Sequence, residues 1–543
     1  MPHKRLNIIL SIIIVIGMIG VYIYKQQSEP GGYFNKLLAK EQKYAVSTAH
    51  PEASRVGMQI LEQGGTAVDA AIAISYALGV VEPFGSGIGG GGTMLVYPKG
   101  KDPVVFDYRE TAPFTGTIPT TNVGVPGFVK GMEMAHKKFG KLPMDKLIQP
   151  SIDLAEKGVA ASDELHNRLK FAQYRIDWRS IPHLYPGGKP IEPRKLVVQK
   201  DLANTLKQIR DKGSQAFYSG PLAEKIALQS KGLQVSDLQK YQPEEKKPLI
   251  KKYRDYEMIS TAPPSGGVML YQSLVMADQI KAQSEKDLSA EFIHLLAEVN
   301  KRVTASKREN IGDPKFTKVP TEDITSASYI KKLATDIQRD KISTGYKEVV
   351  DTIADKENHD NTTHFVVIDK EGNVVSTTNT LSNFFGSGIY VDGFFLNNQL
   401  ANFSESKNSP NKPAPGKKPI SYTAPTILAK DNKPIIAIGS AGGRNITPVL
   451  TEILIRIIDF NQPLQKAIDG TRFIVEKNNV ILEENIPDTE KAKLIRMGYQ
   501  VEVRKNNPSF YGSVQGIKID WDKNTIDGGA DLRRHGDFKV SES

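Results

Sequence analysis

The chain has no cysteine among its 543 residues. This absence excludes a thiol nucleophile, a disulfide, a zinc site with cysteine ligands and a lipid-modified cysteine anchor. Covalent catalysis by this chain is therefore expected to use a hydroxyl group. The redox compartment stays open, because a cysteine-free chain tolerates oxidising surroundings and cytosolic proteins can also lack cysteine.

A strong charge imbalance is also missing. The 71 lysines and arginines outnumber the 61 acidic residues, which gives a net charge of +10. This excess is small for the surface of a long chain. No compact basic stripe with interleaved aromatic residues is present, so nucleic-acid binding is not expected. Anionic lipid or an acidic polymer is compatible with this charge. The 39% hydrophobic and 24% charged residues are typical of a globular protein with two domains or one large layered α/β domain.

The N-terminus carries a long hydrophobic run. Lys4 and Arg5 precede an almost unbroken apolar stretch from Leu6 to Tyr24, which as a helix would span roughly 28 Å and cross a bilayer. Because cationic flanks stay in the cytoplasm, residues 1–24 predict a single-pass anchor in the cell membrane with the catalytic domain extracellular. The alternative is a cleaved signal peptide, but residues 22–25 offer no small-x-small cleavage site.

Helical patterns dominate the part of the chain that follows a polar stalk at 25–43. The apolar stretch Ala67 to Val81 predicts a buried core helix, because it is too short to span a bilayer and contains Asp69. Thr66 and Asp69 resemble a capping box at its start. Further helices are expected at Phe128 to Lys138, Leu147 to Lys157, Leu202 to Lys212 and Ala290 to Arg302.

The last third of the chain changes to β-strands. Strands are predicted at 364–368 and 374–378, with a turn at 369–373 between them. The charged segment 343–361 before them is of a kind that lies exposed. An exposed segment is thus expected to meet a strand that starts at Thr362.

Glycine is concentrated in two places. The run Gly85 to Gly92 lets backbone approach a ligand or another chain closely, so it indicates either tight packing or a site lining; it lacks the spacing of a phosphate-binding loop. The second place is Gly439 to Gly443, after a predicted strand at Ile435 to Ile438. Successive amides there can point at one oxygen, as an oxyanion hole requires.

Thr362 can become a nucleophile if it is the first residue of a chain. A threonine hydroxyl needs a base, and a free α-amine with a pKa of roughly 7.7 to 8.0 can accept its proton. This chemistry requires a cut between Asn361 and Thr362. Taken alone, Thr362-Thr363-His364 is as readily an ordinary strand start with a hydrogen-bonded His364.

Seven motifs, in order, give the chain a close resemblance to the γ-glutamyltranspeptidase family. They are Gln63 to Ala73, Gly85 to Gly91, Asp107 to Pro113, Gly124 to Gly127, Thr261 to Gly267, Thr362 to His364, and Gly439 to Arg444. The resemblance implies a four-layer αββα sandwich of the N-terminal-nucleophile hydrolase type without metal or organic cofactor. It also implies a precursor that is split into a large segment, 44–361, and a small segment, 362–543, which associate as a heterodimer.

The resemblance also implies roles for individual residues. Thr362 would cut the Asn361–Thr362 bond and then act as catalytic nucleophile, Thr380 would orient it, and Gly442 and Gly443 would form the oxyanion hole. The implied substrate-binding residues are Arg109, Ser382, Gln399, Asn402, Ser421 and Arg534. Arg109 would hold a substrate α-carboxylate, since guanidinium pairs bidentately with carboxylate; the alternative is a structural pair with Asp107 or Glu110.

Three departures from the common family pattern concern the substrate. Asn402 stands where relatives that cleave glutathione have an aspartate for the free α-ammonium, and an amide side chain instead suits the amide nitrogen inside a γ-linked polymer. Ser421-Tyr422 replaces a Ser-Ser pair, and only 15 residues lie between Phe403 and Pro419, where many relatives have a longer lid. These changes resemble capsule depolymerases of the family. Arg534 is expected either to contact polymer carboxylates or to lie in a solvated basic turn.

The sequence therefore predicts a self-processing enzyme that cleaves poly-γ-glutamate and transfers the γ-glutamyl group to water or to an amine such as a cell-wall peptide. One alternative is a glutathione hydrolase that acts on small γ-glutamyl compounds. Another is a catalytically inactive, membrane-tethered protein that binds polyanions. The stereochemistry of the glutamate, the ratio of hydrolysis to transfer, the acceptor and the oligomeric state are not fixed by the sequence.

Overall fold

The computed structural model describes residues 42–346, 351–354, 360–505 and 507–542. Contacts divide the chain into a unit at Met1–Gln42 and a unit at Lys43–Ser543, and the second unit is described below. The predicted anchor at 1–24 lies outside the described residues, as does the stalk at 25–43 except for its last two residues. Within the described ranges, no helix combines the length and the apolar character needed to cross a bilayer.

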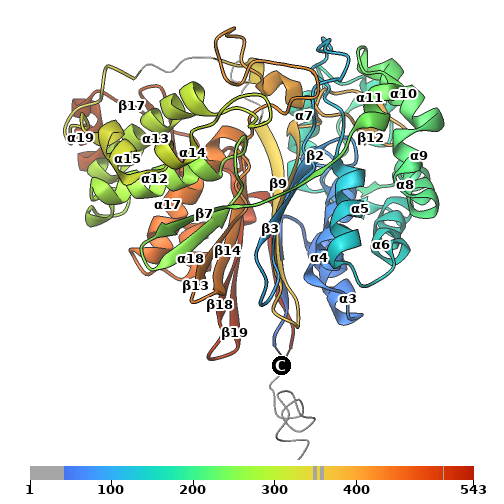
Figure 1. The fold of residues 1–543 in the computed structure, drawn as a ribbon, viewed down its shortest axis with the longest axis horizontal. Helices are drawn as coiled ribbons and strands as arrows, with labels where there is room; N and C mark the ends of the chain where they lie inside the picture. Colours follow the sequence, from blue (N-terminus) through green and yellow to red (C-terminus); the bar gives the residue numbers. More distant parts are fainter. Residues whose placement is uncertain (1–41, 347–350, 355–359, 506, 543) are drawn as a thin grey trace, which may run out of the picture. The chain divides into compact units, whose positions relative to one another are not determined.

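Two antiparallel sheets form the centre of the larger unit (Figure 1). The seven strands of the first sheet, in spatial order, are β20 (Asp537–Val540), β1 (Ala45–Thr48), β9 (Asp360–Ile368), β10 (Val374–Asn383), β2 (Gly91–Tyr97), β3 (Val104–Asp107) and β6 (Glu244–Lys246). The six of the second sheet are β19 (Thr525–Ala530), β18 (Ser513–Asp520), β14 (Lys433–Ala441), β13 (Thr426–Lys430), β8 (Tyr256–Ser260) and β7 (Leu249–Tyr253). Apolar side chains such as Leu95, Val366 and Ile517 fill the space between the sheets.

Helices cover the outer face of each sheet. The helices on the side of the first sheet are α3 (Pro51–Glu62), α4 (Ala67–Val81), α5 (Phe128–Phe139), α6 (Met144–Lys157), α7 (Asp163–Ala172), α8 (Lys200–Lys212), α9 (Gln215–Tyr218), α10 (Gly220–Ser230) and α11 (Val235–Lys240). Those on the side of the second are α12 (Gly267–Gln279), α13 (Ala290–Asn310), α14 (Thr321–Ile324), α15 (Ala327–Ala334), α17 (Ile446–Ile458), α18 (Leu464–Asp469) and α19 (Asp488–Met497). Each helical layer has its own apolar core with its sheet. The order helices, sheet, sheet, helices confirms the predicted αββα layers.

Small elements complete the unit. They are the sheet of β15 (Phe473–Glu476), β16 (Asn479–Leu482) and β17 (Gln500–Val503), the strand pairs β4 (Val159–Ala160) with β5 (Leu196–Val197) and β11 (Tyr390–Val391) with β12 (Phe394–Phe395), and 3-10 turns including η4 (Gln399–Asn402), η5 (Gly443–Asn445) and η7 (Leu532–Arg534). The turns η4 and η5 matter most, because both border the candidate site.

The local patterns in the sequence predicted several elements closely. Helix α4 has the predicted bounds, and Thr66 and Asp69 form the capping box in both directions. It is buried on nearly all sides because it packs against α3 and α6 as well as against β9 and β10. The four other predicted helices correspond to α5, α6, α8 and α13. The two predicted strands form the hairpin of β9 and β10, which are both longer than predicted.

Candidate active site

The Asn361–Thr362 junction is buried, which corrects the expectation of an exposed junction. Strand β9 begins at Asp360, so both junction residues already lie in the central sheet. Asn361 is fully buried and Thr362 is 4% exposed. The junction packs against the start of the glycine-rich segment, since Asn361 Nδ2 donates to the carbonyl oxygen of Phe84 at 3.4 Å and Gly85 lies next to the carbonyl group of Thr362.

A β-bulge places the hydroxyl of Thr380 over the junction. Register along β9 and β10 pairs Thr363 with Asn379 and Asn361 with Ser382, so Thr380 and Leu381 together oppose Thr362. Ser382 adopts a positive φ of 76° where the bulge ends. A bulge of this kind re-aims side chains that a regular ladder would point to opposite faces. Its consequence here is a pair of threonine hydroxyls on the same side of the sheet.

The contacts of these two hydroxyls suit an attack on the preceding carbonyl group. Thr380 Oγ1 donates a hydrogen bond of 2.8 Å to the carbonyl oxygen of Asn361. It also lies 3.4 Å from Thr362 Oγ1 and accepts a bond of 2.9 Å from the amide of Ser382. A hydroxyl donor on a carbonyl oxygen withdraws electron density from the carbonyl carbon. The carbonyl next to the candidate nucleophile is thus already polarised.

The glycine-rich segment packs directly behind these threonines. A Cβ on Gly90 would lie 2.3 Å from the carbonyl oxygen of Thr380, and one on Gly89 would lie 2.1 Å from that of Phe395. Gly85 approaches the carbonyl of Thr362 and accepts a hydrogen bond from the amide of Leu381. A side chain would not fit at Gly89 or Gly90. Of the two alternatives for this segment, the structure shows the tight packing, because none of its residues is among those that line the pocket.

Seven of the predicted site residues line a single pocket. They are Thr362, Thr380, Ser382, Gln399, Asn402, Ser421 and Gly443, and the other lining residues are Tyr422, Thr423 and Ile446. The pocket has a volume of about 20 Å³, which is enough for about one water molecule. In the intact chain described here, the pocket is therefore too small for a glutamyl group.

A glycine turn forms one wall of the pocket. Gly442 and Gly443 have positive φ angles of 128° and 52°, and they connect β14 through η5 to the N-terminus of α17. Gly443 lines the pocket, and β9 packs against η5. Gly442 does not line it but lies next to Gly443. The N-terminal end of α17 adds its partial positive charge on the same side, which suits a developing oxyanion.

Asn402 is oriented by its neighbours in the pocket. Its side-chain nitrogen donates to Ser382 Oγ at 2.9 Å and to the carbonyl oxygen of Gln399 at 3.3 Å. Because both contacts use the NH₂ group, the carbonyl oxygen of the side chain is the group that Asn402 offers to a ligand. This arrangement matches an N–H donor in the substrate.

Arg109 does not line this pocket. Its guanidinium makes two 3.2 Å contacts with the carboxylate of Asp107 and donates to the carbonyl oxygen of Pro419 at 3.0 Å. Although burial raises the pKa of Asp107, the cations of Arg109, Lys246 and Lys418 hold it well below its usual value. The alternative that the sequence left open, a structural pair with Asp107, is what the structure contains. A contact between Arg109 and a substrate carboxylate stays a prediction.

Arg534 contacts both residues of the junction but is not among the residues that line the pocket. It is 3% exposed, so the expectation of a solvated basic turn is wrong. Its Nη1 donates to Asn361 Oδ1 at 2.7 Å and to the carbonyl oxygen of Thr362 at 3.4 Å. Burial is the main cause that lowers its pKa to about 10. The structure thus gives Arg534 a role in holding the junction, and its predicted contact with polymer carboxylates stays a prediction.

One residue next to the junction, Glu82, escaped the sequence analysis. Glu82 Oε2 accepts a hydrogen bond of 2.9 Å from Thr363 Oγ1, directly after the junction. Burial raises the pKa of Glu82 to about 8, against the opposing effects of that hydrogen bond and of Arg534. One feature of the sequence could have indicated Glu82. It directly follows the apolar helix α4, and a carboxylate at a helix C-terminus is unfavourable because the helix dipole is negative there. His364, in contrast, is an ordinary buried histidine that contacts Thr378 at 2.9 Å, and burial lowers its pKa to about 3.

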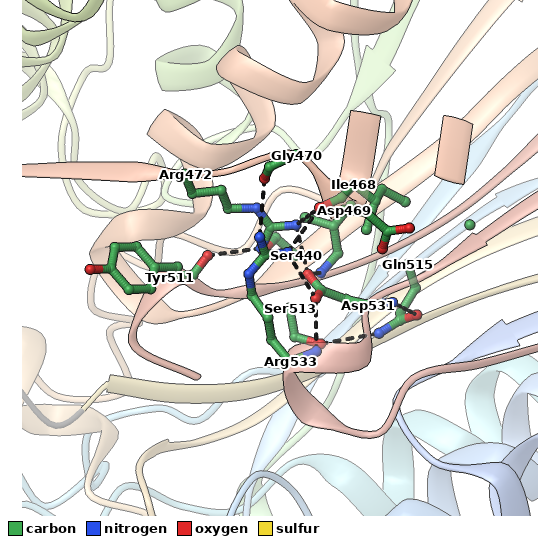
Figure 2. Close-up of polar contacts among 12 residues, drawn as sticks. Ser440, Ile468, Asp469, Gly470, Arg472, Tyr511, Ser513, Gln515, Asp531 and Arg533 are labelled. Atoms are coloured by element: carbon green, nitrogen blue, oxygen red, sulfur yellow. Dashed lines mark hydrogen bonds and ion pairs between the residues drawn. The ribbon is translucent and has the colours of Figure 1, made fainter. Parts of the chain in front are cut away.

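A buried ionic cluster holds the chain that packs on the glycine turn (Figure 2). Arg472 pairs with Asp531 at 2.7 Å and donates to the carbonyl oxygen of Tyr511 at 2.9 Å. The carboxylate of Asp531 also accepts from the amide of Val514. Gly512 lies between these anchor points. A Cβ added to Gly442 of the turn would lie 3.1 Å from the Cα of Gly512, so the two segments are in close contact. The cluster therefore fixes one side of the turn that lines the pocket.

The fold and the pocket together define a class. A threonine hydroxyl beside a polarised amide carbonyl and a glycine turn, carried by a two-sheet sandwich, is the arrangement of an amide-bond hydrolase or acyltransferase. The family model described as "Gamma-glutamyltranspeptidase" matches residues 53–541. The chain belongs to the γ-glutamyltranspeptidase family and is thus a γ-glutamyl transferase or hydrolase.

Individual relatives cover nearly the whole chain. The capsule biosynthesis protein CapD proenzyme of Bacillus anthracis is 41% identical over 92% of this chain and 91% of its own length. The glutathione hydrolase proenzyme of Bacillus subtilis is 35% identical over 98% of this chain and 97% of its own length. Among solved structures, a cephalosporin acylase from Bacillus halodurans superposes with a TM-score of 0.83 at 25% identity, over 93% of this chain and 96% of its own.

Proposed function

We propose that the chain is a self-processing γ-glutamyl hydrolase and transpeptidase that cleaves poly-γ-glutamate through the hydroxyl of Thr362. The observation that carries the proposal is the hydrogen bond from Thr380 Oγ1 to the carbonyl oxygen of Asn361, beside Thr362 Oγ1. It supplies the polarised carbonyl and the nearby hydroxyl that both self-cleavage and catalysis require.

In the self-cleavage step, Thr362 Oγ1 attacks the carbonyl carbon of Asn361. The Thr380 hydroxyl stabilises the oxyanion, the peptide C–N bond breaks, and the nitrogen takes up the hydroxyl proton. Water then hydrolyses the resulting ester, which leaves a carboxylate on Asn361 and both an amine and a hydroxyl on Thr362. Segments 44–361 and 362–543 are expected to stay together, because β1 pairs with β9, and β2 with β10, across the cut. Relatives that are named proenzymes support this processing.

In the catalytic cycle, the new α-amine of Thr362 takes the hydroxyl proton while Oγ1 attacks a γ-amide carbonyl. The amides of Gly442 and Gly443 stabilise the oxyanion. The leaving nitrogen receives the proton from the amine, and a γ-glutamyl ester on Thr362 remains. Water or an acceptor amine then attacks this ester and regenerates the hydroxyl.

The neutral character of the pocket supports a polymer substrate. Asn402 offers a carbonyl oxygen, which can accept a hydrogen bond from the amide N–H of an internal polymer residue. It lacks the negative charge that would strengthen a contact with a free ammonium group. The 41% identity to a protein named for capsule biosynthesis agrees with an acidic capsule polymer as substrate. Arg109 could contribute a carboxylate contact only after its guanidinium exchanges part of its pairing with Asp107.

Glutathione hydrolysis is the second candidate, because a relative with that name is 35% identical over nearly the whole chain. The two candidates are separated by measuring kcat/KM of the purified protein with poly-γ-glutamate and with glutathione. A higher value for the polymer supports the proposal. A higher value for the tripeptide would overturn the role assigned to Asn402.

The replacement Thr362→Ala tests the nucleophile. It removes the hydroxyl, so we expect a single uncut chain on a denaturing gel and no turnover of either substrate. The matched control, Thr362→Ser, keeps a hydroxyl and is expected to be cut at the same bond, as N-terminal sequencing of the small segment would show. An active, uncut Thr362→Ala protein would refute the mechanism.

The cellular setting is part of the proposal. An anchor at residues 1–24 would place the catalytic domain outside the cell, where a capsule polymer and peptidoglycan amines are present. Protease treatment of intact cells should then degrade the domain, whereas a cytoplasmic domain would survive until the cells are lysed.

A further inference from the structure

A second cavity opens beside the nucleophile pocket. Its volume is about 470 Å³, within the range of ligand sites, and it lies between α13, the hairpin of β15 and β16, and the start of α17. We call it the basic groove, and its charged lining residues are Lys301, Lys307, Arg308, Asp351, Arg444, Glu476 and Lys477. All elements named here except the hairpin belong to the helical layer of the second sheet (Figure 1).

The basic groove adjoins the nucleophile pocket. Tyr422 lines both cavities. Arg444 and Asn445 line the groove, and their chain neighbours Gly443 and Ile446 line the pocket. A chain-like ligand held at Thr362 would reach the groove by extending past Tyr422.

The charge of the groove favours an anionic ligand. In the described part of the chain, five cationic side chains and two carboxylates line it. Lys307 is buried, donates to the hydroxyl of Tyr422 at 2.8 Å and lies 4.7 Å from the centre of its ring, which places a cation where the two cavities adjoin. Arg444 pairs with Glu476 at 3.2 Å and Lys301 with Glu298 at 2.9 Å, so part of the positive charge is compensated. The remaining excess lies on a concave surface, where it acts more strongly than on an open one.

We propose that the basic groove binds the α-carboxylates of polymer residues beyond the one whose carbonyl group Thr362 attacks. The inference rests on the proposed function and deepens it. A γ-linked glutamate polymer carries one carboxylate per residue, and the described lining of the nucleophile pocket has no cation to pair with them. The adjoining groove provides the volume and the charge that the rest of such a chain needs. A tripeptide such as glutathione is too short to use it fully.

The test removes two groove cations that lie away from the reacting atoms. The double variant Arg308→Gln/Lys477→Gln changes a half-buried and an exposed side chain, so the fold and self-cleavage should be kept. The matched control, Lys195→Gln/Lys200→Gln, removes the same charge from exposed positions on the side of the first sheet. We expect the groove variant to raise KM for poly-γ-glutamate about fivefold, to weaken its salt dependence and to leave kcat nearly unchanged. For glutathione and a chromogenic γ-glutamyl anilide, KM should change less than about twofold in both variants.

The length of the substrate gives a second measure. For the unmodified protein, KM should fall as γ-glutamyl oligomers become longer, until the groove is filled. This decrease should be much smaller in the groove variant. Equal polymer KM values in the groove variant and the unmodified protein, or an equal rise in the control variant, would overturn the inference.

Binding to an uncut chain separates this inference from the proposed function. In Thr362→Ala the groove keeps the state described here, so fluorescently labelled poly-γ-glutamate should bind, and adding the two groove replacements should weaken this binding about fivefold. Such a result would support the groove even if the processed enzyme preferred glutathione. Absence of a difference between the two uncut proteins would reject it even if the enzyme cut the polymer.

Discussion

The two sides of the Asn361–Thr362 junction differ in charge. On the pocket side, none of the lining residues in the described part of the chain is an acid, a lysine, an arginine or a histidine. Outside the pocket lining, the buried Arg534 contacts both junction residues, the buried Glu82 contacts the next residue, Thr363, and the ionic pair of Arg472 with Asp531 holds a neighbouring segment. Chemistry and support are thus assigned to separate sets of side chains.

This difference suits an enzyme whose base is its own N-terminal amine. A cation in the pocket would lower the pKa of that amine, and an anion would raise it. A neutral pocket keeps such charge effects small, so that the pKa stays closer to the roughly 7.7 to 8.0 of a free chain end. The charged groups behind the junction fix its position through strong hydrogen bonds without taking part in the proton transfers. The following predictions test this division of roles.

The largest effect is expected on the supporting side, from Asp531→Ala. This change leaves Arg472 buried without its carboxylate and removes the acceptor of the Val514 amide. Breaking a fully buried ion pair lowers the free energy of unfolding by about 3 to 5 kcal/mol, which a denaturant titration can measure. The control Asp527→Ala lies exposed on the preceding strand and should change it by less than about 0.5 kcal/mol. Similar losses in both variants would show that the cluster does not support the fold.

The next effect is expected on the pocket side, from Thr380→Ala. Without the hydroxyl donor on the Asn361 carbonyl, we expect self-cleavage to slow roughly 100-fold. The loss of its two buried hydrogen bonds should lower the free energy of unfolding by about 1 to 3 kcal/mol. Band intensities over time after synthesis measure the rate. Thr380→Ser keeps the donor and should be cut within a few-fold of the normal rate. A normal rate in the alanine variant would remove Thr380 from the mechanism.

The sequence predicted local features well and tertiary contacts poorly. The capping box of Thr66 and Asp69 and the hairpin around 369–373 depend on neighbouring residues, so their patterns are visible in the chain itself. The pocket came from the family resemblance, because its walls are separated by up to 84 residues along the chain, from Thr362 to Ile446. Thr423 could have been found, since it lies two residues after Ser421 on an extended segment and faces the same way.

Contacts that depend on register or on burial were missed. The bulge that aims Thr380 at the junction follows from the pairing of β9 with β10, which single-sequence patterns do not fix. Arg109 and Arg534 were expected to face substrate because both are cations in relevant motifs. The pairing of Arg109 with Asp107 was an open alternative that the structure decides, whereas the contact of Arg534 with Asn361 became visible only in three dimensions.

A smaller effect should appear in specificity, from Asn402→Asp. The new carboxylate would attract a free α-ammonium group, a charge-assisted gain of around 1 kcal/mol, and would repel polymer carboxylates. We expect the ratio of kcat/KM for glutathione to that for poly-γ-glutamate to rise about fivefold or more. The change lies in the pocket, so the control is the rate of self-cleavage, which should stay within a few-fold of normal. An unchanged ratio would mean that the side chain of Asn402 does not contact the α-nitrogen of the substrate.

The smallest effect concerns the pH dependence of stability and Glu82. Burial raises its pKa to about 8 from an ordinary value of 4.5, so the folded chain keeps a proton that the unfolded chain releases as the pH rises between these values. Its contribution to stability is therefore complete below about pH 4.5 and is lost progressively as the pH rises to about 8. Glu82→Gln has no proton to lose. The melting temperature of this variant should therefore rise relative to that of the unmodified protein as the pH is raised from about 5 to 8. The exposed Glu224→Gln should show no such gain, and a constant difference across this range for Glu82→Gln would mean that the buried carboxyl is already ionised.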